Sequence, residues 1–190
     1  MDETTMTIQD SFESSLESLV STHPAVNEIR RRRKFQESRH VLRIGANDLP
    51  YNLTQTTLRG PDMISREPRV FTDDEAGSLI AFYHLGLKLA GHSKIVHGGL
   101  AAVLLDECMG RACFPRLVGK VAVTAKLDLS YKSPIPVNSV VVIRADTTKV
   151  QGRKAWVEAR IEDAREGTVL VEAEALFVEP KWAAEMAKVL

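Results

Sequence analysis

The sequence predicts an α+β fold in which an antiparallel β-sheet wraps one long central helix, preceded by a helical extension. Three observations lead to this prediction. Residues 98–114 are apolar on almost every side, as expected of a buried helix. Residues 121–178 alternate apolar and polar side chains in segments separated by turn residues, which is typical of strands packed on a core. Residues 11–38 carry apolar side chains at helical spacing.

Length and charge fit one domain plus that extension. The chain has 190 residues, and its 25 Lys and Arg residues balance 25 Asp and Glu residues, so the formal net charge is zero. A neutral chain gives no reason to expect a nucleic acid as partner. No apolar run reaches the roughly 18 residues of a membrane span, and the acidic first residues lack the apolar core of a signal peptide. We therefore expect a cytoplasmic protein without a membrane span, with a mitochondrial location as the alternative.

The two cysteines, Cys108 and Cys113, fall in the predicted central helix. Side chains five residues apart on a helix point to different faces, so these two cannot pair within it. We expect free, buried thiols in a reducing compartment. The five histidines are scattered and no Cys/His spacing fits zinc, so we expect no metal site.

The extension is expected to contain two helical stretches that break near His23 and Pro24, because proline suits the first turn of a helix. An apolar stripe at helical spacing supports the first stretch: Phe12, Leu16, Leu19 and Val20. The basic run at residues 30–34 is interpreted as a solvated helix face, with contact to a ligand phosphate or a partner as the alternative. Residues 40–65 show little periodicity, and we expect them to wrap the core or to cover a pocket.

The elements of the main domain follow in a definite order. Two strands are expected at residues 68–73 and 77–86, joined by a hairpin turn at residues 73–77. The central helix covers residues 98–114, and Pro115 ends it. Four further strands are expected at residues 121–131, 139–150, 155–163 and 168–178. A short helix is expected after Pro180.

Alternation assigns the side chains of two of these strands to faces. In the strand after the helix, one face carries Val123, Ala125, Leu127, Leu129 and Tyr131. The opposite face carries Thr124, Lys126, Asp128 and Ser130. In the last strand, the inward side chains are Val171, Ala173, Ala175 and Phe177.

The start of the central helix carries the groups for acyl-transfer chemistry. Gly98 and Gly99 lack a Cβ, so their backbone N–H groups can closely approach a ligand. Because the first-turn N–H groups are unpaired and lie at the positive end of the helix dipole, they can stabilise a developing oxyanion. Asp106 places a carboxylate in the same apolar helix, which is costly unless the carboxylate is used or paired. We expect Gly98 to donate to the oxyanion, with the alternative that the two glycines only allow close packing at the start of the helix.

The spacing of Gly98 and Asp106 predicts a homodimer. Eight residues of helix separate them by about 12 Å, so one helix cannot bring both to the same carbonyl carbon. Two antiparallel copies of the helix, related by a two-fold axis, would place Gly98 of one chain near Asp106 of the other. We therefore expect an obligate dimer with two equivalent sites, and the dimers can pair further into a tetramer.

The segment HGGLAAVLLDE, followed by TAKLDLSYKSPIPVNS, resembles the thioesterase superfamily of the hotdog fold. It is similar in particular to the acyl-CoA thioesterase branch with phenylacetate-pathway and human thioesterase-superfamily members. The preceding GSLIAFYHLGLKLAGHSKIVHGG resembles fungal members. The resemblance implies an extension at residues 1–65, a hotdog domain at 66–180 and a tail at 181–190. It also implies hydrolysis of acyl-CoA or acyl-carrier thioesters without a cofactor, coenzyme A being part of the substrate.

The resemblance gives roles to several residues. An acid at the position of Asp106 acts as general base on water or as nucleophile, and burial beside Leu104 and Leu105 would strengthen it as a base. A structural carboxylate is the alternative. Thr124 matches a position where a hydroxyl can hold the attacking water, although an outward hydroxyl on a strand is otherwise ordinary. His97 is expected to orient its loop, with direct catalysis as the alternative.

Other residues are candidates for substrate contact. Glu107 lies about 100° around the helix from Asp106, so only one of the two can face the substrate. Glu107 is expected to form a hydrogen bond or ion pair at the interface, and Gly99 to allow close approach of the substrate. Relatives carry an asparagine or glutamine shortly before the His-Gly-Gly triplet, where His92 or Ser93 can substitute here.

Three basic residues are candidates for the nucleotide end of coenzyme A: Lys132, Arg153 and Lys154. The alternative is that they are only solvated turn residues.

Two other functions stay open at this point. The chain can be a non-catalytic acyl-CoA-binding or regulatory protein of the same fold. It can also hydrate enoyl thioesters, but hydratases of this fold usually pair an Asp with a His a few residues later, and no histidine follows Asp106. A serine hydrolase is not indicated, because the sequence has no Gly-x-Ser-x-Gly elbow.

Overall fold

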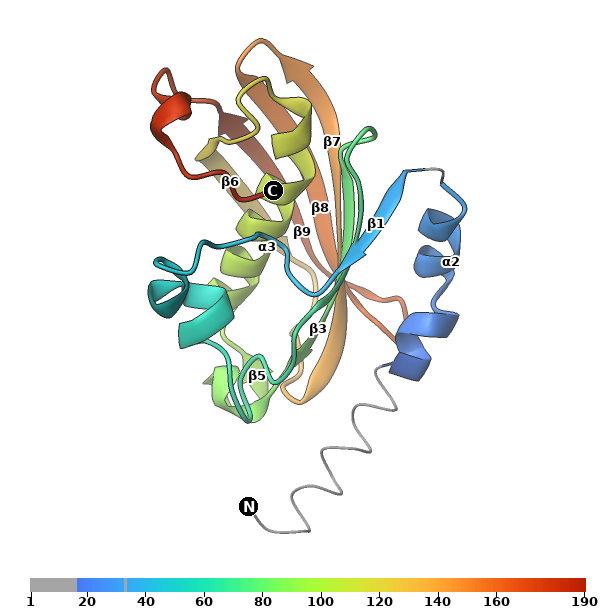
Figure 1. Ribbon diagram of the computed structural model, residues 1–190. Coiled ribbons are helices and arrows are strands. Elements are labelled where there is room, and N and C mark those ends of the chain that lie inside the picture. The colour runs from blue at the N-terminus through green and yellow to red at the C-terminus, as the bar shows by residue number, and fades with distance from the viewer. Residues whose placement is uncertain (1–16, 33) are drawn as a thin grey trace.

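The computed structural model describes residues 17–32 and 34–190, and it has one antiparallel sheet curled around helix α3 (Gly98–Cys113), as Figure 1 shows. The strand order is β1-β2-β3-β7-β8-β9-β6. The strands are β1 (Phe35–Ser38), β2 (Arg69–Asp73), β3 (Ser78–Leu85), β6 (Val123–Tyr131), β7 (Ser139–Gln151), β8 (Lys154–Asp163) and β9 (Val169–Val178). The predicted α+β fold with a central helix is confirmed.

The main core lies between α3 and the inner face of the sheet. Leu104, Leu105 and Met109 of α3 are fully buried. Burial of each such side chain stabilises the fold by about 1.5–3 kcal/mol relative to exposure. The inward residues predicted for β9 are buried, and Phe177 meets Phe114 edge to face with ring centroids 6.2 Å apart. The predicted inner face of β9 is therefore confirmed.

A second, smaller core lies on the outer face of the sheet, on the side away from α3 (Figure 1). Helix α2 (Pro24–Arg30) buries Val26 and Ile29 against Phe71 and Phe82 of the sheet. The predicted break before Pro24 is present, because residues 17–22 are helical and His23 caps α2 by accepting a hydrogen bond from Ala25 N–H. Phe12 and Leu16 of the predicted stripe lie outside the described residues.

The prediction that helix continues to residue 38 was wrong. α2 ends at Arg30, and Phe35–Ser38 form β1, which pairs with β2 from Phe35↔Asp73 to Ser38↔Val70. Phe35 packs against the outer core, so burial and ladder hydrogen bonds outweigh the local helical pattern. The described part of the basic run is paired with acids of the same chain, as in Arg32 with Asp73 at 3.8 Å.

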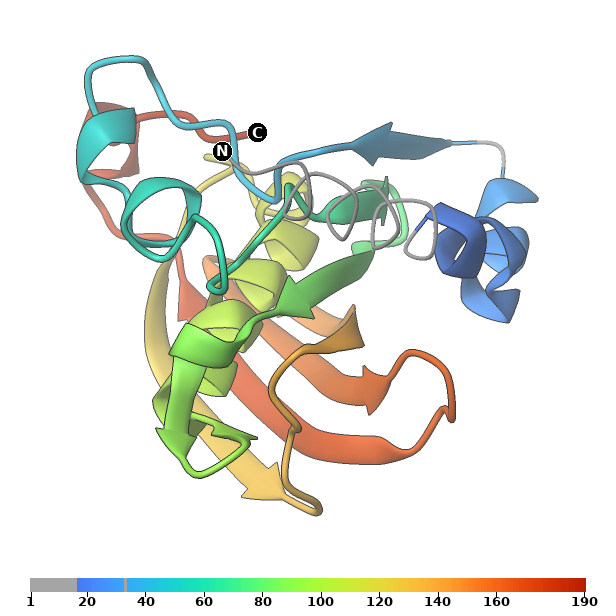
Figure 2. The ribbon, with the colours of Figure 1, turned by 90° about the horizontal axis from the view of Figure 1, so that it is seen from below.

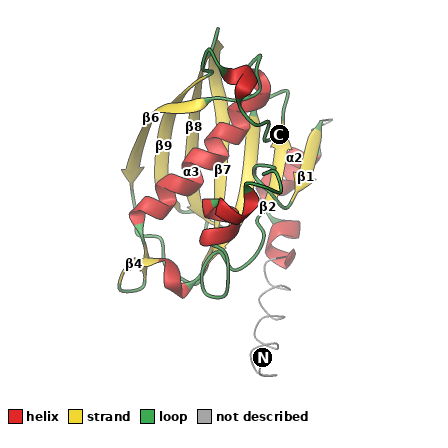
Figure 3. Cartoon of the chain, turned by 60° about the vertical axis from the view of Figure 1, so that its left-hand side comes forward, coloured by secondary structure: helices red, strands yellow, loops and turns green. Residues whose placement is uncertain are grey.

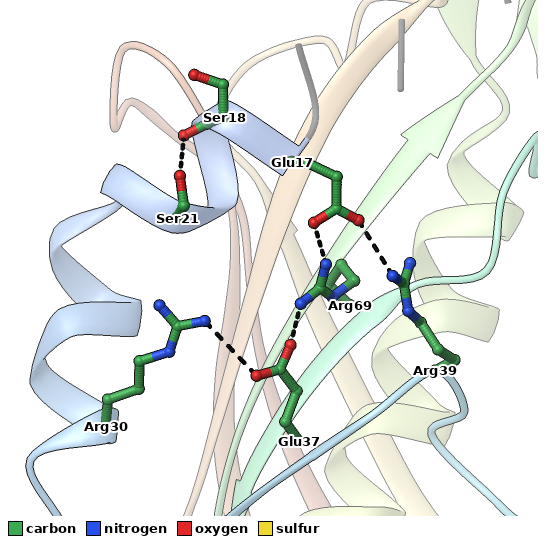
Figure 4. A network of polar contacts seen from close by, with 7 residues as sticks. All are labelled: Glu17, Ser18, Ser21, Arg30, Glu37, Arg39 and Arg69. Atoms are coloured by element: carbon green, nitrogen blue, oxygen red, sulfur yellow. Dashed lines mark hydrogen bonds and ion pairs between the residues drawn. The ribbon is translucent and has the colours of Figure 1, made fainter. Parts of the chain in front are cut away.

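An ion-pair network ties the extension to the edge of the sheet (Figure 4). Arg69 of β2 donates to both Glu17 and Glu37. Arg39 pairs with Glu17 at 3.2 Å, and Arg30 pairs with Glu37 at 3.5 Å. The network therefore joins the first helical residues, α2, β1 and β2.

Residues 39–65, here called the strap, cross α3 on the side away from strands β6 to β9 (Figure 2). The strap contains two short helical turns, η1 (Leu49–Tyr51) and η2 (Leu53–Thr57). Val41 and Ile64 of the strap are buried in the main core. The C-terminal tail joins it, because Val189 O accepts a hydrogen bond of 2.8 Å from Arg43 N–H. The prediction that this region wraps the core is confirmed.

Three shorter features complete the chain. A small hairpin of β4 (Ala90–His92) and β5 (Ile95–Val96) leads into α3 (Figure 3). The short helix expected after Pro180 is the single turn η5 (Ala183–Glu185). Within the described residues, no helix combines the length and the apolar character that a membrane crossing requires.

Candidate active site

The β4–β5 hairpin positions the residue that begins α3. His97 N–H donates to Leu89 O at 2.9 Å, and His97 is the N-cap of α3. Gly91 makes this close packing possible, because a Cβ at residue 91 would lie 2.7 Å from His97 Cα. A larger residue at 91 would therefore displace His97.

The first turn of α3 presents one free backbone donor. Gly99 N–H donates to His97 Nδ1 at 2.9 Å, and Gly98 O accepts from the Tyr131 hydroxyl at 2.8 Å. Within residues 17–32 and 34–190, the Gly98 N–H donates no hydrogen bond. Gly98 and Gly99 are exposed, so a ligand atom can reach this donor.

Asp106 is paired with Thr124 of β6. The Thr124 hydroxyl donates to Asp106 Oδ1 at 2.7 Å. Asp106 is partly buried and Thr124 is exposed in the single chain. The hydroxyl and the carboxylate that the sequence singled out are therefore in direct contact.

The face predicted for Thr124 was wrong. β6 has a β-bulge at Ala125. Thr124 pairs with Phe177 and Lys126 pairs with the neighbouring Leu176, so Ala125 has no partner residue on β9. The bulge turns Thr124 to the inner face, which it shares with Leu127. Strict alternation would have pointed the hydroxyl away from Asp106.

Glu107 points to a different side of α3 from Asp106. The pKa of the Glu107 carboxyl lies above its usual value, mainly because the carboxyl is buried. A hydrogen bond from the Thr54 hydroxyl lowers this pKa, and the nearby charge of Asp106 raises it. Thr54 belongs to η2 of the strap. Glu107 thus connects α3 to the strap within one chain, and its contact across an interface stays a prediction.

Comparisons with known proteins agree with this fold. Residues 93–174 match the family model of the thioesterase superfamily. The crystal structure of mouse thioesterase superfamily member 2 matches with a TM-score of 0.51 at 19% identity, over 54% of this chain and 75% of that one. A putative phenylacetic acid degradation-related thioesterase from Ralstonia eutropha gives 0.51 at 23% identity, over 56% and 80%. Residues 93–174 are thus similar to the thioesterase superfamily, and the chain shares the hotdog fold of these structures.

Several curated relatives of the chain are uncharacterised, and others carry a name. An uncharacterised mitochondrial protein of Candida albicans is 37% identical over 130 residues, which cover 66% of this chain and 58% of that protein. MIOREX complex component 3 of Saccharomyces cerevisiae is 35% identical, with 67% and 48% covered. The mouse acyl-coenzyme A thioesterase THEM4 is 38% identical over 99 residues, with 52% and 42% covered. The chain spans about half the length of the curated relatives it matches.

The other candidate residues lie on the β4–β5 hairpin, after β6 and at the β7–β8 turn. His92 and Ser93 form the exposed tip of the β4–β5 hairpin, where Ser93 N–H donates to His92 Nδ1 at 2.9 Å. Lys132 follows β6 and pairs with Glu172 at 2.9 Å. Arg153 and Lys154 lie at the β7–β8 turn, and Arg153 donates to Glu179 O at 2.9 Å. None of these side chains contacts Asp106 or Gly98 in the described chain.

Sequence reasoning missed one residue of this site, Tyr131. The alternation did place its side chain on the same face as Leu127, but nothing in the sequence gave its hydroxyl a partner. Cys108 and Cys113 are free and buried, as predicted. In the part of the chain that the structure describes, no three His, Cys, Asp or Glu side chains gather as a metal site would require.

Proposed function

We propose that the chain hydrolyses acyl-CoA or acyl-carrier thioesters to the free acid and the thiol. The observation that carries this proposal is the 2.7 Å hydrogen bond from Thr124 to Asp106, on the helix whose first turn leaves the Gly98 N–H free. Relatives support it: THEM4 is named an acyl-coenzyme A thioesterase, and a structural neighbour from Streptococcus pneumoniae, with a TM-score of 0.51, was crystallised with coenzyme A.

The proposed reaction uses Asp106 as the base. Its carboxylate takes a proton from a water that the Thr124 hydroxyl helps to orient, and the water oxygen attacks the thioester carbonyl carbon. The carbonyl oxygen becomes an oxyanion that accepts a hydrogen bond from the Gly98 N–H. The C–S bond then breaks, and the leaving thiolate takes the proton back from Asp106. The products are the acid and the free thiol.

A second copy of the chain completes each site in this proposal. Among the described strands, β6 ends the sheet and pairs only with β9, so its outer edge is open there. Leu127 and Leu129, on its inner face, are only partly buried, whereas Val171 and Ala175 of β9 are buried. Antiparallel pairing of β6 with a second β6 would cover these leucines. It would also bring Asp106 of one chain towards Gly98 of the other, in a homodimer.

The same pairing gathers the basic candidates for the nucleotide of coenzyme A. Lys154 pairs with Val178, which pairs with Val123, so the β7–β8 turn lies at the Thr124 end of β6. Lys132 lies at the opposite end of β6, beside Tyr131. A two-fold axis across β6 therefore places Lys132 of one chain near Arg153 and Lys154 of the other, where all three can meet phosphates.

We further propose that the chain acts in mitochondria. Curated relatives are named as mitochondrial, including the Candida albicans protein and the mitochondrial membrane protein FMP10 of Saccharomyces cerevisiae, which is 30% identical over 146 residues. The cytoplasmic location expected from the sequence receives no support from these relatives. Fractionation of cells that produce the tagged protein tests the location.

Thiol release from a panel of acyl-CoAs tests the proposed reaction. Asp106→Asn should lower kcat by about a hundredfold or more, because general-base catalysis contributes about 10²–10⁴. Asp128→Asn is the matched control, since Asp128 pairs with Lys126 on the opposite face of β6. Full activity of Asp106→Asn would refute the mechanism. Binding of acyl-CoA without thiol release from any substrate would favour a non-catalytic binding protein.

A further inference from the structure

The peptide group between Gly98 and Gly99 is fixed from both sides. Its carbonyl oxygen accepts from the Tyr131 hydroxyl at 2.8 Å, and its N–H donates to His97 Nδ1 at 2.9 Å. Tyr131 comes from the end of β6, whereas His97 comes from the turn before α3. Two elements far apart in the sequence therefore hold one peptide plane.

These two hydrogen bonds matter because a backbone of two adjacent glycines is especially flexible. Glycine has no Cβ to restrict its dihedral angles, and the first turn of a helix has few internal hydrogen bonds. The free Gly98 N–H belongs to the preceding peptide group, between His97 and Gly98, which shares the Gly98 Cα with the fixed one. Holding the Gly98–Gly99 plane therefore limits the directions in which the Gly98 N–H can point.

Among the residues that the structure describes, the Tyr131 hydroxyl has no other hydrogen-bond partner than Gly98 O. In the single chain the residue is 56% exposed, so folding of the chain does not require its hydroxyl to satisfy a buried polar group. The backbone around it is anchored without the side chain, because Lys132 N–H and Ser133 N–H both donate to Leu170 O, at 2.8 and 3.1 Å. The hydrogen bond from the Tyr131 hydroxyl therefore serves to orient Gly98 more than to stabilise the fold.

We propose that Tyr131 is a positioning residue that aims the Gly98 N–H at the substrate carbonyl oxygen, an inference that rests on the proposed function. Tyr131 touches no reacting atom. It acts through the Gly98–Gly99 peptide, together with His97. Strand β6 then serves both halves of the site, with Thr124 at Asp106 and Tyr131 at Gly98.

Tyr131→Phe tests the proposal, because it removes the hydroxyl and keeps the ring. We expect kcat to fall about tenfold, the loss typical of one hydrogen bond, with KM and the melting temperature nearly unchanged. Tyr51→Phe is the control, since Tyr51 is 86% exposed on the strap. In Gly98→Pro, which has no N–H to aim, Tyr131→Phe should lower kcat no further. An additive loss in that double variant, or no loss in the single one, would overturn the proposal.

Backbone amide exchange gives a readout that does not depend on activity. Tyr131→Phe should speed the exchange of the Gly99 amide proton, which donates to His97 Nδ1, measured by NMR, while Tyr51→Phe should leave it unchanged. Unchanged exchange in Tyr131→Phe would overturn the proposal even if the enzyme is active. If the wild type releases no thiol from any substrate, the proposed function fails, and faster exchange would still establish that Tyr131 orders this peptide.

Discussion

Thr124 meets Asp106 because β6 has one more residue than β9 at this point. Without the bulge at Ala125, the alternation of the strand would direct the Thr124 hydroxyl to the outer face. The sequence therefore singled out two residues that are in contact, but it predicted the wrong face for one of them. A bulge depends on the register between two strands, and the sequence of one strand does not contain that register.

Gly98 allows an unusually clean test of a backbone donor. Proline fits the first position of a helix, and His97 already has the extended backbone that a following proline requires, with φ −59° and ψ 127°. Gly98→Pro should therefore remove the N–H and keep α3, lowering kcat by about 10²–10³.

Gly98→Ala is the matched control for this substitution. Both variants add a Cβ at residue 98, and an ideal Cβ there lies 3.3 Å from the Tyr131 hydroxyl oxygen. Alanine keeps the backbone N–H, whereas proline removes it. The alanine variant should thus lose far less activity in the thiol-release assay. Equal activities of the two variants would show that the Gly98 N–H does not stabilise the oxyanion.

At the scale of elements, the long periodic segments were predictable and the short ones were not. α3, β2, β3 and β7 to β9 begin and end within about two residues of their predicted positions, because their patterns extend over many residues. β4 and β5 are too short for a pattern, and their turn uses Lys94 at φ 61°, a conformation that lysine does not signal. β1 forms because it pairs with β2, and this pairing is not visible in the local sequence of residues 35–38, which favoured a helix.

The ion-pair network of the extension predicts a pH-dependent contribution to stability. Burial raises the pKa of Glu17, but the hydrogen bond and charge of Arg69, with those of Arg39, outweigh it and lower the pKa below the usual 4.5. A carboxyl with a lowered pKa stabilises the fold above its unfolded-state pKa, and this contribution is lost as the pH falls through the folded-state pKa. The contribution is therefore present at neutral pH and disappears in acid.

Glu17→Gln should lower the free energy of unfolding near neutral pH by about 1 kcal/mol or less, because the Glu17 side chain is 45% exposed and solvent screens its charge. The difference from wild type should shrink as the pH falls below 4.5, the usual pKa of this carboxyl. Urea unfolding at several pH values measures it, with Glu166→Gln in the exposed β8–β9 turn as control. A difference that is constant from neutral to acid pH would rule out the ion pairs as its source.

At the scale of the whole molecule, the proposed mechanism gives a single chain two half-sites and no complete site. Gly98 and Asp106 are eight residues apart on α3, about 12 Å, and each contacts a residue of the edge strand β6. The helix spacing alone predicts a site shared between two chains, which stays a prediction. The side chains that would meet across such an interface are not predictable from one sequence, because they depend on a second copy.

Subunit mixing tests most directly the central claim, that each site takes Asp106 from one chain and the Gly98 N–H from the other. Asp106→Asn and Gly98→Pro should each be nearly inactive alone. After random exchange, about half of the dimers are mixed and each has one intact site, so thiol release should recover to about a quarter of the wild-type rate. No recovery, with mixed dimers verified by native mass spectrometry, would contradict a site shared between two chains.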